Sequence, residues 1–173
     1  MEFEHIKCPL KRYTFSVKPM REWAELNCEG RVLNLFAGKT LLNVDELRND
    51  VDPDMPADFH MDALELVEHM SSFEVIKDSF SVSMFEFETI LLDPPYSYRK
   101  SMEMYNGFKA SPFRQLKDAL PNILAPNGKI ITFGYHSISM GKGRGFEVEK
   151  VALFSHGGAI HDTIATIERK VKA

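Results

Sequence analysis

The sequence predicts an α/β fold with a mostly parallel, twisted sheet that closes with an antiparallel β-hairpin. Along most of the chain, short apolar runs alternate with segments of helical periodicity, which is typical of parallel strands joined by crossovers. The last two predicted strands, Phe146 to Ser155 and Ile160 to Lys170, are separated only by His156-Gly157-Gly158-Ala159. A connection this short joins antiparallel neighbours, so these two strands predict the hairpin.

The length and composition predict one domain. The chain has 173 residues, 44% of them hydrophobic, which suffices for one buried core and is too short for two ordinary domains. We expect a single domain over residues 1–173, with 1–17 as an N-terminal extension of uncertain structure. No stretch approaches the roughly 20 apolar residues of a membrane helix, and the start MEFEHIKCPLKRYTF lacks the apolar middle of a secretory signal. The expected location is the cytoplasm, with no membrane partner.

The charged and metal-binding residue types exclude several classes of function. Cys8 and Cys28 lie far apart without a CxxC pair, so we expect reduced thiols and neither a disulfide framework nor structural zinc. The histidines are scattered singly, and no metal is expected. The net charge of −4 argues against strong non-specific binding to nucleic acid, which needs a basic excess. Local basic clusters could still bind it, namely Lys7, Lys11, Arg12, Arg99, Lys100, Lys142 and Arg144.

The first half of the chain opens with a helix and a buried strand. Residues Pro19 to Asn27, PMREWAELN, begin with proline and carry apolar positions on one face, which predicts a short amphipathic helix. Arg31 to Phe36, RVLNLF, predicts a buried strand, and Ala37-Gly38-Lys39-Thr40 predicts the turn after it. Weaker patterns predict a second strand at Glu46 to Val51, a third at Ala57 to Met61 and a short helix at Asp62 to Met70.

The second half contains the most strongly predicted strand. Phe87 to Leu92 is an apolar run that stops abruptly at Asp93-Pro94-Pro95-Tyr96, or DPPY. Pro112 to Leu124 predicts a helix that Pro121 either kinks or ends early. Asn127-Gly128 then turns the chain into another buried strand, Lys129 to Gly134. Because ligands of open α/β sheets gather at the carboxyl ends of strands, DPPY stands where chemistry is expected.

The acidic region between the second and third predicted strands is too short for an ordinary crossover. Only about ten residues separate Asp50 from Asp62. A connection between parallel strands takes a dozen or more residues and is usually helical. Either the crossover is an extended loop or one of the two weak strands lies outside the sheet, so one crossover helix is expected to be missing.

Together these motifs resemble the S-adenosyl-L-methionine-dependent amino-group methyltransferases of nucleic acids, which include DNA adenine-N6 and cytosine-N4 enzymes. The resemblance covers Lys18 to Arg169. Lys18-Pro19, the helix after it and the run from Gly30 to Gly38 are similar to the KP helix and FxGxG cofactor loop of that family, and DPPY is similar to its catalytic motif. It implies a Rossmann-like class I methyltransferase fold. Lys39 and Thr40 depart from the pattern, because the family commonly has a small residue and a second glycine there.

The resemblance implies S-adenosyl-L-methionine as the cofactor and a site for it. Gly38 would face the methionine part, Asp50 (or, second, Asp52) would accept the ribose hydroxyls, and Asp62 would accept the adenine amino group. The implied cofactor residues are Lys18, Pro19, Asn34, Leu35, Phe36, Ala37, Gly38, Asp50, Asp52, Asp62 and Ala63. The alternatives are an ordinary turn for FAGKT, and helix caps or solvated loop carboxylates for the acids. Clustered calcium ligands are a further alternative, although no twelve-residue calcium-loop pattern is present.

DPPY suits methyl transfer to an amino nitrogen. The lone pair of a base amino group is delocalised into its ring, so catalysis must localise that pair and aim it at the methyl group. The Asp93 carboxylate and the Pro94 carbonyl would each accept one N–H, while Pro95 restricts the backbone. Tyr96 would stack on the base, a contact worth about 1–3 kcal/mol in other nucleic acid systems. The alternative is a capping turn after a core strand.

Three further places are candidates for substrate binding. The segment after DPPY mixes aromatic and basic residues as a lid over a substrate would, or it is an ordinary polar loop. His136 follows the strand that ends at Gly134 and is either a substrate contact or a loop hydrogen-bonder. The Gly-rich stretch MGKGRG carries two cations. The candidates are Tyr98, Arg99, Lys100, His136, Lys142 and Arg144.

The first hypothesis is therefore a methyltransferase acting on an exocyclic amine of a nucleic acid base. DNA adenine-N6 is favoured over cytosine-N4 and RNA guanine-N2, and nucleic acid is the expected partner, DNA ahead of RNA. Because nothing resembles a separate target-recognition domain, specificity would come from short loops, a homodimer or a partner protein. The alternatives are a protein-glutamine or small-molecule methyltransferase and a catalytically inactive module that binds nucleic acid or cofactor.

Overall fold

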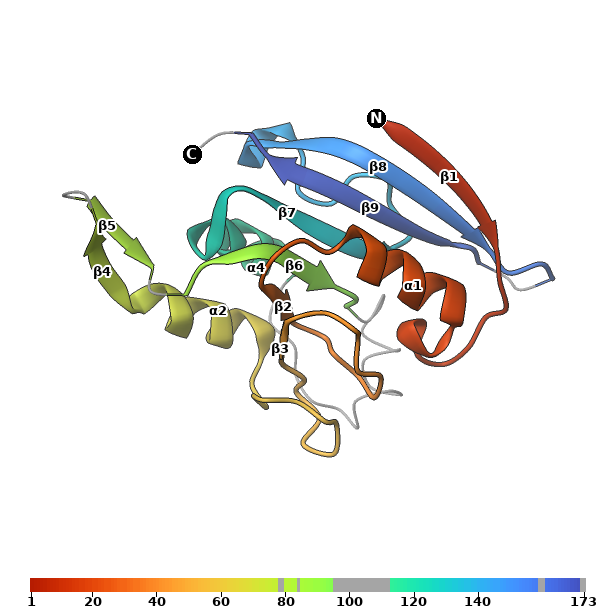
Figure 1. The fold of residues 1–173 in the computed structure, drawn as a ribbon, viewed down its shortest axis with the longest axis horizontal. Helices are drawn as coiled ribbons and strands as arrows, with labels where there is room; N and C mark the ends of the chain where they lie inside the picture. Colours follow the sequence, from red (N-terminus) through yellow and green to blue (C-terminus); the bar gives the residue numbers. More distant parts are fainter. Residues whose placement is uncertain (78–79, 84, 95–112, 159–160, 172–173) are drawn as a thin grey trace.

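The computed structural model describes residues 1–77, 80–83, 85–94, 113–158 and 161–171. A twisted seven-stranded sheet runs through it in the order β1-β8-β9-β7-β6-β2-β3 (Figure 1). Its strands are β1 (Glu2–Lys7), β2 (Val32–Asn34), β3 (Glu46–Arg48), β6 (Phe87–Leu92), β7 (Leu124–Gly134), β8 (Phe146–Ser155) and β9 (Thr163–Lys170). Every neighbouring pair is parallel except the two that involve β9, so β9 runs against the other six.

The predicted α/β class and the closing hairpin are confirmed. β8 has its predicted bounds, and β9 begins at Thr163, three residues later than predicted. The extension over 1–17 is better ordered than the sequence indicated, because β1 joins the sheet edge beside β8 and a 3₁₀ turn follows at Thr14–Ser16. None of the helices in the described ranges has the length and apolar character that a membrane crossing needs.

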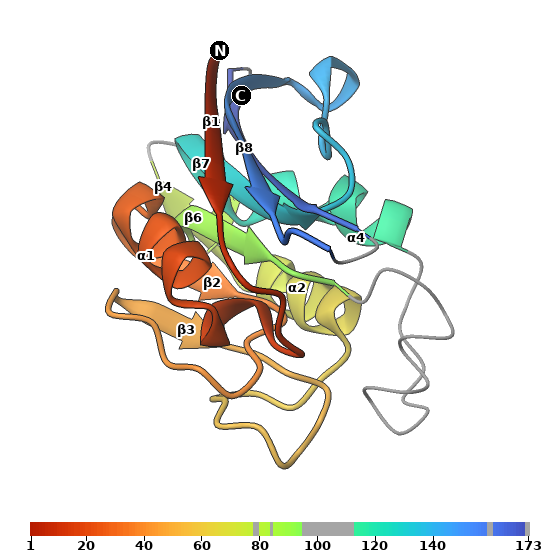
Figure 2. The ribbon, with the colours of Figure 1, turned by 90° about the vertical axis from the view of Figure 1, so that its right-hand side faces the viewer.

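Helices cover both faces of the sheet (Figure 2). They are α1 (Lys18–Asn27) on one face, and α2 (Ala63–Ser72) and α4 (Phe113–Ala119) on the other. On the α1 face, Phe15 and Trp23 meet Phe133 edge to face at 5.3 and 5.8 Å between ring centroids, and Trp23 also meets Phe154 at 5.8 Å. Such ring pairs contribute about 0.5–1.5 kcal/mol each beyond their apolar burial, so they fix α1 on the sheet.

On the other face, α2 and α4 bury leucine and methionine side chains against β2, β6 and β7. The predicted helix from Pro112 ends early, since α4 gives way to a 3₁₀ turn at Leu120–Asn122 that contains Pro121. The predicted turn at Asn127-Gly128 lies inside β7 instead. There the pairing with β6 shifts register, and Asn127 has φ of 59°. A small hairpin that the sequence did not indicate, β4 (Glu74–Lys77) and β5 (Phe80–Ser83), extends from the end of α2.

Two segments on the β3 side of the sheet contain no helix, namely the β2–β3 crossover and the loop from β3 to α2. Residues 35–45, between the parallel strands β2 and β3, contain no helix, and neither does the loop from Asn49 to Asp62. The predicted third strand at Ala57 to Met61 is reduced to a single parallel bridge between Asn49 and Phe59. Both alternatives for this short region are therefore realised: the crossover is a loop, and the third strand is nearly absent.

A buried carboxylate organises the connection from β7 to β8. Glu168 of β9 is fully buried and accepts the backbone N–H groups of Ser139, Met140 and Gly141, each at 2.8 Å. Hydrogen bonds to a charged acceptor are roughly twice as strong as neutral ones, so one side chain holds three backbone groups of a loop that contains no α-helix. The loop ends in a 3₁₀ turn at Lys142–Arg144 that leads directly into β8.

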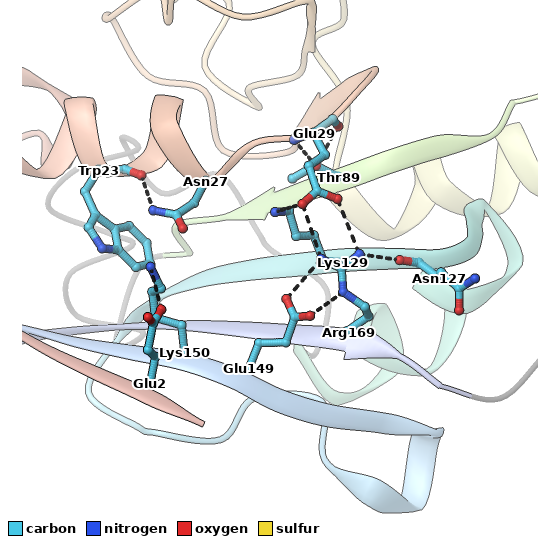
Figure 3. A network of polar contacts seen from close by, with 10 residues as sticks. All are labelled: Glu2, Trp23, Asn27, Glu29, Thr89, Asn127, Lys129, Glu149, Lys150 and Arg169. Atoms are coloured by element: carbon cyan, nitrogen blue, oxygen red, sulfur yellow. Dashed lines mark hydrogen bonds and ion pairs between the residues drawn. The ribbon is translucent and has the colours of Figure 1, made fainter.

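The amino ends of the strands are joined by ion pairs (Figure 3). Lys129 of β7 is bonded to Glu29 at 2.7 Å, and Arg169 of β9 contacts both Glu29 and Glu149. Lys150 of β8 reaches Glu2 of β1 at 2.9 Å. These pairs tie β1, β7, β8 and β9 to the segment before β2.

Candidate active site

The carboxyl ends of β6, β2 and β3 meet at one edge of the sheet. Asn34, the last residue of β2, pairs with Leu91 of β6 on one side and with Arg48 of β3 on the other. The segments that leave these strands therefore start side by side. They are Asp93 and Pro94 after β6, Leu35 to Gly38 after β2, and Asn49 to Asp52 after β3.

The chain leaves β2 through a glycine turn that the end of β3 holds in place. Gly38 has φ of +58°, a left-handed conformation that favours glycine. A side chain there would meet only Tyr13, whose Cδ1 lies 3.7 Å from the position of an added Cβ, so backbone conformation rather than space requires the glycine. The Gly38 N–H donates to Asp50 Oδ2 at 2.8 Å, and the Ala37 N–H donates to the Asn49 carbonyl at 3.0 Å.

Arg48 holds this turn by hydrogen bonds to its carbonyl groups. Its guanidinium is buried and donates to the carbonyls of Thr40 and Gly38 at 2.9 Å and of Ala37 at 3.2 Å, while Nε donates to the Pro56 carbonyl at 2.7 Å. The same group is paired with Glu46. In the absence of a crossover helix, one side chain satisfies the loop carbonyls. Sequence reasoning missed Arg48, although a cation in a short strand between acidic residues was a signal.

Asp50 and Asp52, the predicted ribose acceptors, are both buried at this edge. Asp50 Oδ1 accepts the Asp52 N–H at 3.0 Å, and Asp52 Oδ1 accepts the Asp54 N–H at 3.0 Å. Burial raises the pKa of the Asp50 carboxyl above its ordinary value. A carboxylate has about four lone-pair sites, so Asp50 still has acceptor capacity for a hydroxyl after these bonds.

Asn34 carries a buried acceptor without a partner among the described residues. Its side chain is fully buried, and Nδ2 donates to Glu46 Oε2 at 3.0 Å, which fixes the orientation of the amide. Within the described part of the chain, its Oδ1 has no hydrogen-bond partner. A buried polar atom left unpaired costs about 1–3 kcal/mol, so an unpaired one at the end of a central strand fits a site that awaits a donor group.

The predicted adenine acceptor, Asp62, caps a helix. Its Oδ1 accepts the backbone N–H groups of Leu64 at 3.0 Å and of Glu65 at 3.4 Å, at the start of α2, and Ala63 is the first residue of that helix. The helix-cap alternative for this acid is thus observed. A cap of this kind contributes typically about 1 kcal/mol and orients the carboxylate at the carboxyl edge.

The start of α1 also lies at the carboxyl edge (Figure 1). Lys18 and Pro19 are its first two residues, and Lys18 is exposed with Glu22 at 3.6 Å. The preceding Phe15 packs against Phe133, near the carboxyl end of β7, which places the neighbouring Tyr13 beside Gly38. Tyr13 is a second residue that the sequence patterns did not single out.

Two predicted substrate residues lie elsewhere. Lys142 and Arg144 immediately precede β8, whose first residue, Phe146, pairs with Lys170. Because β8 runs in the same direction as β7, this is the amino edge of the sheet. Arg144 there donates to Asp118 of α4 at 2.7 Å. Along β9, Lys170 lies six residues, or about 20 Å, from Ile164, which pairs with Gly134 at the end of β7, so these two cations precede β8 at the edge opposite to the end of β7.

His136 lies two residues beyond β7 at the carboxyl edge and is exposed, so the structure keeps it near the end of β6. Asp93 and Pro94 are half-buried. The other predicted catalytic and lid residues lie outside the described residues: Pro95, Tyr96, Tyr98, Arg99 and Lys100. Within the described ranges, no three His, Cys, Asp or Glu residues are grouped as a metal site would require.

A hollow of about 460 Å³ lies at the amino edge, far from these residues. Its walls include Lys129, Lys150 and Arg169, and each of these cations is already paired with a glutamate. The chemistry-bearing residues gather instead at the carboxyl edge, where open α/β sheets bind their ligands.

The fold and this edge define a Rossmann-like α/β protein of the kind found in methyltransferases. Among solved structures the chain is similar to TrmN from Thermus thermophilus, with 16% identity, a TM-score of 0.55, and coverage of 92% of this chain and 50% of TrmN. It is also similar to a SAM-dependent methyltransferase from Agrobacterium tumefaciens, with 13% identity, a TM-score of 0.52, and coverage of 88% and 61%.

A third similar structure is SMU.776 complexed with SAH, with 14% identity, a TM-score of 0.55, and coverage of 87% of this chain and 48% of that one. The chain thus spans about half the length of TrmN and of SMU.776. No protein-family model and no curated protein matches the sequence. At these identities the similarity establishes the fold.

Proposed function

We propose that the chain is an S-adenosyl-L-methionine-dependent methyltransferase that acts on an exocyclic amino nitrogen of a nucleic acid base, with adenine N6 of DNA as the favoured acceptor. One observation carries the proposal. Asp93 and Pro94 directly follow β6, beside the glycine turn after β2 and the buried carboxylates after β3. This order of strand ends supports the proposal that Asp93 and Pro94 act as an acceptor pair next to the site for a nucleoside with an amino acid group.

The residues at this edge fit the cofactor. The remaining acceptor capacity of Asp50 suits the ribose hydroxyls. The unpaired Oδ1 of Asn34 suits a donor such as an ammonium group. The glycine turn allows the methionine part to approach the backbone. Two similar structures support S-adenosyl-L-methionine as the cofactor. The Agrobacterium tumefaciens protein is a SAM-dependent methyltransferase, and SMU.776 holds SAH.

The chemistry divides between the cofactor and the chain. S-adenosyl-L-methionine supplies an activated methyl group on a sulfonium and a neutral thioether as leaving group. Asp93 and the Pro94 carbonyl each accept one N–H of the substrate amine, so its lone pair is localised on nitrogen. As the new N–C bond forms, positive charge develops on that nitrogen, and the two acceptors stabilise it until one proton leaves. The fixed backbone of proline holds this geometry.

The proposal predicts that Asp93→Ala abolishes methyl transfer and leaves cofactor binding largely intact. A loss of at least about 10²-fold is expected, the scale seen when one fixed transition-state hydrogen-bonding group is removed. The experiment supplies methyl-labelled cofactor to DNA, RNA and protein in parallel and identifies the product by mass spectrometry. Asp118→Ala, at a half-exposed carboxylate of α4, is the matched control. Unchanged transfer by Asp93→Ala would exclude the assignment.

The same assay separates the alternative acceptors. Methylated adenine in DNA supports the favoured acceptor, whereas guanine-N2 in RNA or glutamine in protein would keep the chemistry and change the substrate. A catalytically inactive binding module is the second candidate, favoured by the net charge of −4 and by Lys39 in the cofactor loop. Cofactor binding without any labelled product would support it. For a methyltransferase that acts on nucleic acid, specificity for a target sequence would come from short loops, a homodimer or a partner protein.

A further inference from the structure

Two cations gather on one aromatic ring beside the glycine turn. The Nζ of Lys39 lies over the ring of Tyr13, 5.5 Å from its centroid, and the Cζ of Arg12 lies over the same ring at 5.4 Å. A ring face attracts a cation, so Tyr13 holds each charged group within about 5.5 Å of its ring centroid. We refer to Arg12, Tyr13 and Lys39 as the cation cluster.

The residues that the structure describes do not neutralise the cation cluster. Arg12 and Lys39 are both exposed, and in the described part of the chain neither forms an ion pair. Their neighbours on α1 differ, because Lys18 is paired with Glu22 and Arg21 with Glu25. Two unpaired cations held at one ring offer an attractive position to an anion.

The cluster is fixed against the cofactor loop. Lys39 directly follows Gly38, and Tyr13 Cδ1 lies 3.7 Å from the position that a Gly38 Cβ would take. The backbone of Tyr13 is itself anchored, since its carbonyl accepts the Ser16 N–H at 3.1 Å and the Ser16 hydroxyl at 2.6 Å. The ring that carries the two cations therefore lies directly beside Gly38.

We infer that Lys39 and Arg12 form an anion-binding subsite of the cofactor site, which takes the carboxylate of the methionine part. This inference rests on the proposed function and deepens it. An α-carboxylate is a compact single anion, and it would lie close to Gly38. The departure from the family pattern at Lys39 then acquires a role, because the lysine contributes a cation at the turn in a place where the family commonly has a small residue.

A nucleic acid phosphate is the other anion that such cations bind, and the local charge disfavours it. The carboxylates of Asp50 and Asp52 lie at the same edge, and Asp50 accepts the N–H of Gly38, the residue next to Lys39. A chain of phosphates passing the cluster would be repelled by this acidic loop, whereas the methionine part carries a single carboxylate whose charge its own ammonium group balances.

The test deletes the charge on the protein and on the ligand in turn. Calorimetry measures binding of S-adenosylhomocysteine and of its decarboxylated analogue, which keeps the amine, to the wild-type chain, Lys39→Met and Arg12→Met. We expect Lys39→Met to weaken binding of S-adenosylhomocysteine about tenfold, the scale of one charge-assisted hydrogen bond. Binding of the decarboxylated analogue should stay within about twofold of the wild type. Lys7→Met, at an exposed lysine of β1, is the matched control.

Each other outcome overturns the inference in a distinct way. Equal weakening for both ligands by Lys39→Met would mean that the lysine supports the loop rather than binding a carboxylate. Unchanged binding of S-adenosylhomocysteine together with weaker binding of a DNA duplex would assign the cluster to phosphate. If the wild-type chain binds neither ligand, the proposed function fails together with this inference. If the wild type binds both ligands and Lys39→Met does not discriminate between them, only the inference fails.

Discussion

The two edges of the sheet use charge in opposite ways. At the carboxyl edge, the charged groups of Arg48 and Asp50 are buried and bonded mainly to backbone groups of the loops. At the amino edge, Glu29, Arg169 and Glu149 are partly exposed and bonded to each other's side chains (Figure 3). Buried charge shapes the loops after β2 and β3, whereas exposed charge ties neighbouring strands together.

This difference follows from what each edge lacks. The β2–β3 crossover has no helix, so its carbonyls need donors, and Arg48 supplies them. The amino edge consists of strand ends whose backbones are already paired, so the ion pairs of its side chains add to contacts that the sheet already makes. The carboxyl edge should therefore depend on single residues, and the amino edge on the sum of several weak contacts.

The largest effect should come from Arg48→Met. Removing the guanidinium leaves Glu46 buried without its partner and leaves the loop carbonyls without donors. We expect a loss of about 3–5 kcal/mol in the free energy of unfolding, measured by urea denaturation. Arg48→Lys keeps the charge without the planar fork and should lose less. A loss below about 1 kcal/mol for Arg48→Met would refute the assignment of the loop to this side chain.

The contribution of a carboxylate to stability should change with pH in opposite directions at the two edges. Burial raises the pKa of Asp50, so its folded form holds the proton more tightly than the unfolded chain does. The stability of the wild type relative to Asp50→Asn should then be greatest below the ordinary Asp pKa of 3.8 and should fall as pH rises through the raised value.

Glu29 should show the reverse. The hydrogen bond from Lys129 lowers the pKa of Glu29 below its ordinary value of 4.5. The stability of the wild type relative to Glu29→Gln should be present above pH 4.5 and should be lost as pH falls through the lowered value. Urea denaturation of the three proteins between pH 3 and 7 measures both slopes, and slopes of the same sign would contradict the contrast.

The smallest effect should come from Glu149→Gln. Its carboxylate pairs with Arg169, and the two side chains are 40% and 26% exposed. Exposed pairs contribute about 0.2–1 kcal/mol, and salt screens them. The loss on substitution should shrink between low salt and 1 M salt in denaturation experiments. A larger loss that salt does not change would indicate that the amino edge is as cooperative as the carboxyl edge.

Local patterns predicted the elements whose cause is local. Phe87 to Leu92 has its predicted bounds, because a predominantly apolar segment is stabilised by burial and Asp93-Pro94-Pro95 cannot continue the strand. The helix at Pro19 to Asn27 was predicted within one residue for similar reasons. The glycine turn and the acids after β3 were placed at one edge by chain order alone, since parallel strands end together.

Residues whose role is set by distant partners could not be predicted in this way. The sequence of β1, EFEHIK, has little apolar character, and the strand exists because it pairs with β8. Arg48 and Tyr13 gain their places from the loop between β2 and β3, which is itself unusual in lacking a helix. The sequence analysis placed Lys142 and Arg144 at the substrate site, whereas they lie at the amino edge. The chain returns there after β7 through a loop without an α-helix, so no helical pattern in the sequence indicated the return.

The pairing of β1 with β8 also has a consequence for how the molecule folds as it is made. Glu2 pairs with Lys150, so β1 is synthesised well before the strand with which it pairs. Until residues 146–155 appear, β1 offers an open hydrogen-bonding edge to any strand nearby. Its charged side chains Glu2, Glu4 and Lys7 are the kind that natural edge strands use against aggregation. Docking of β1 should therefore be a late and slow event of folding.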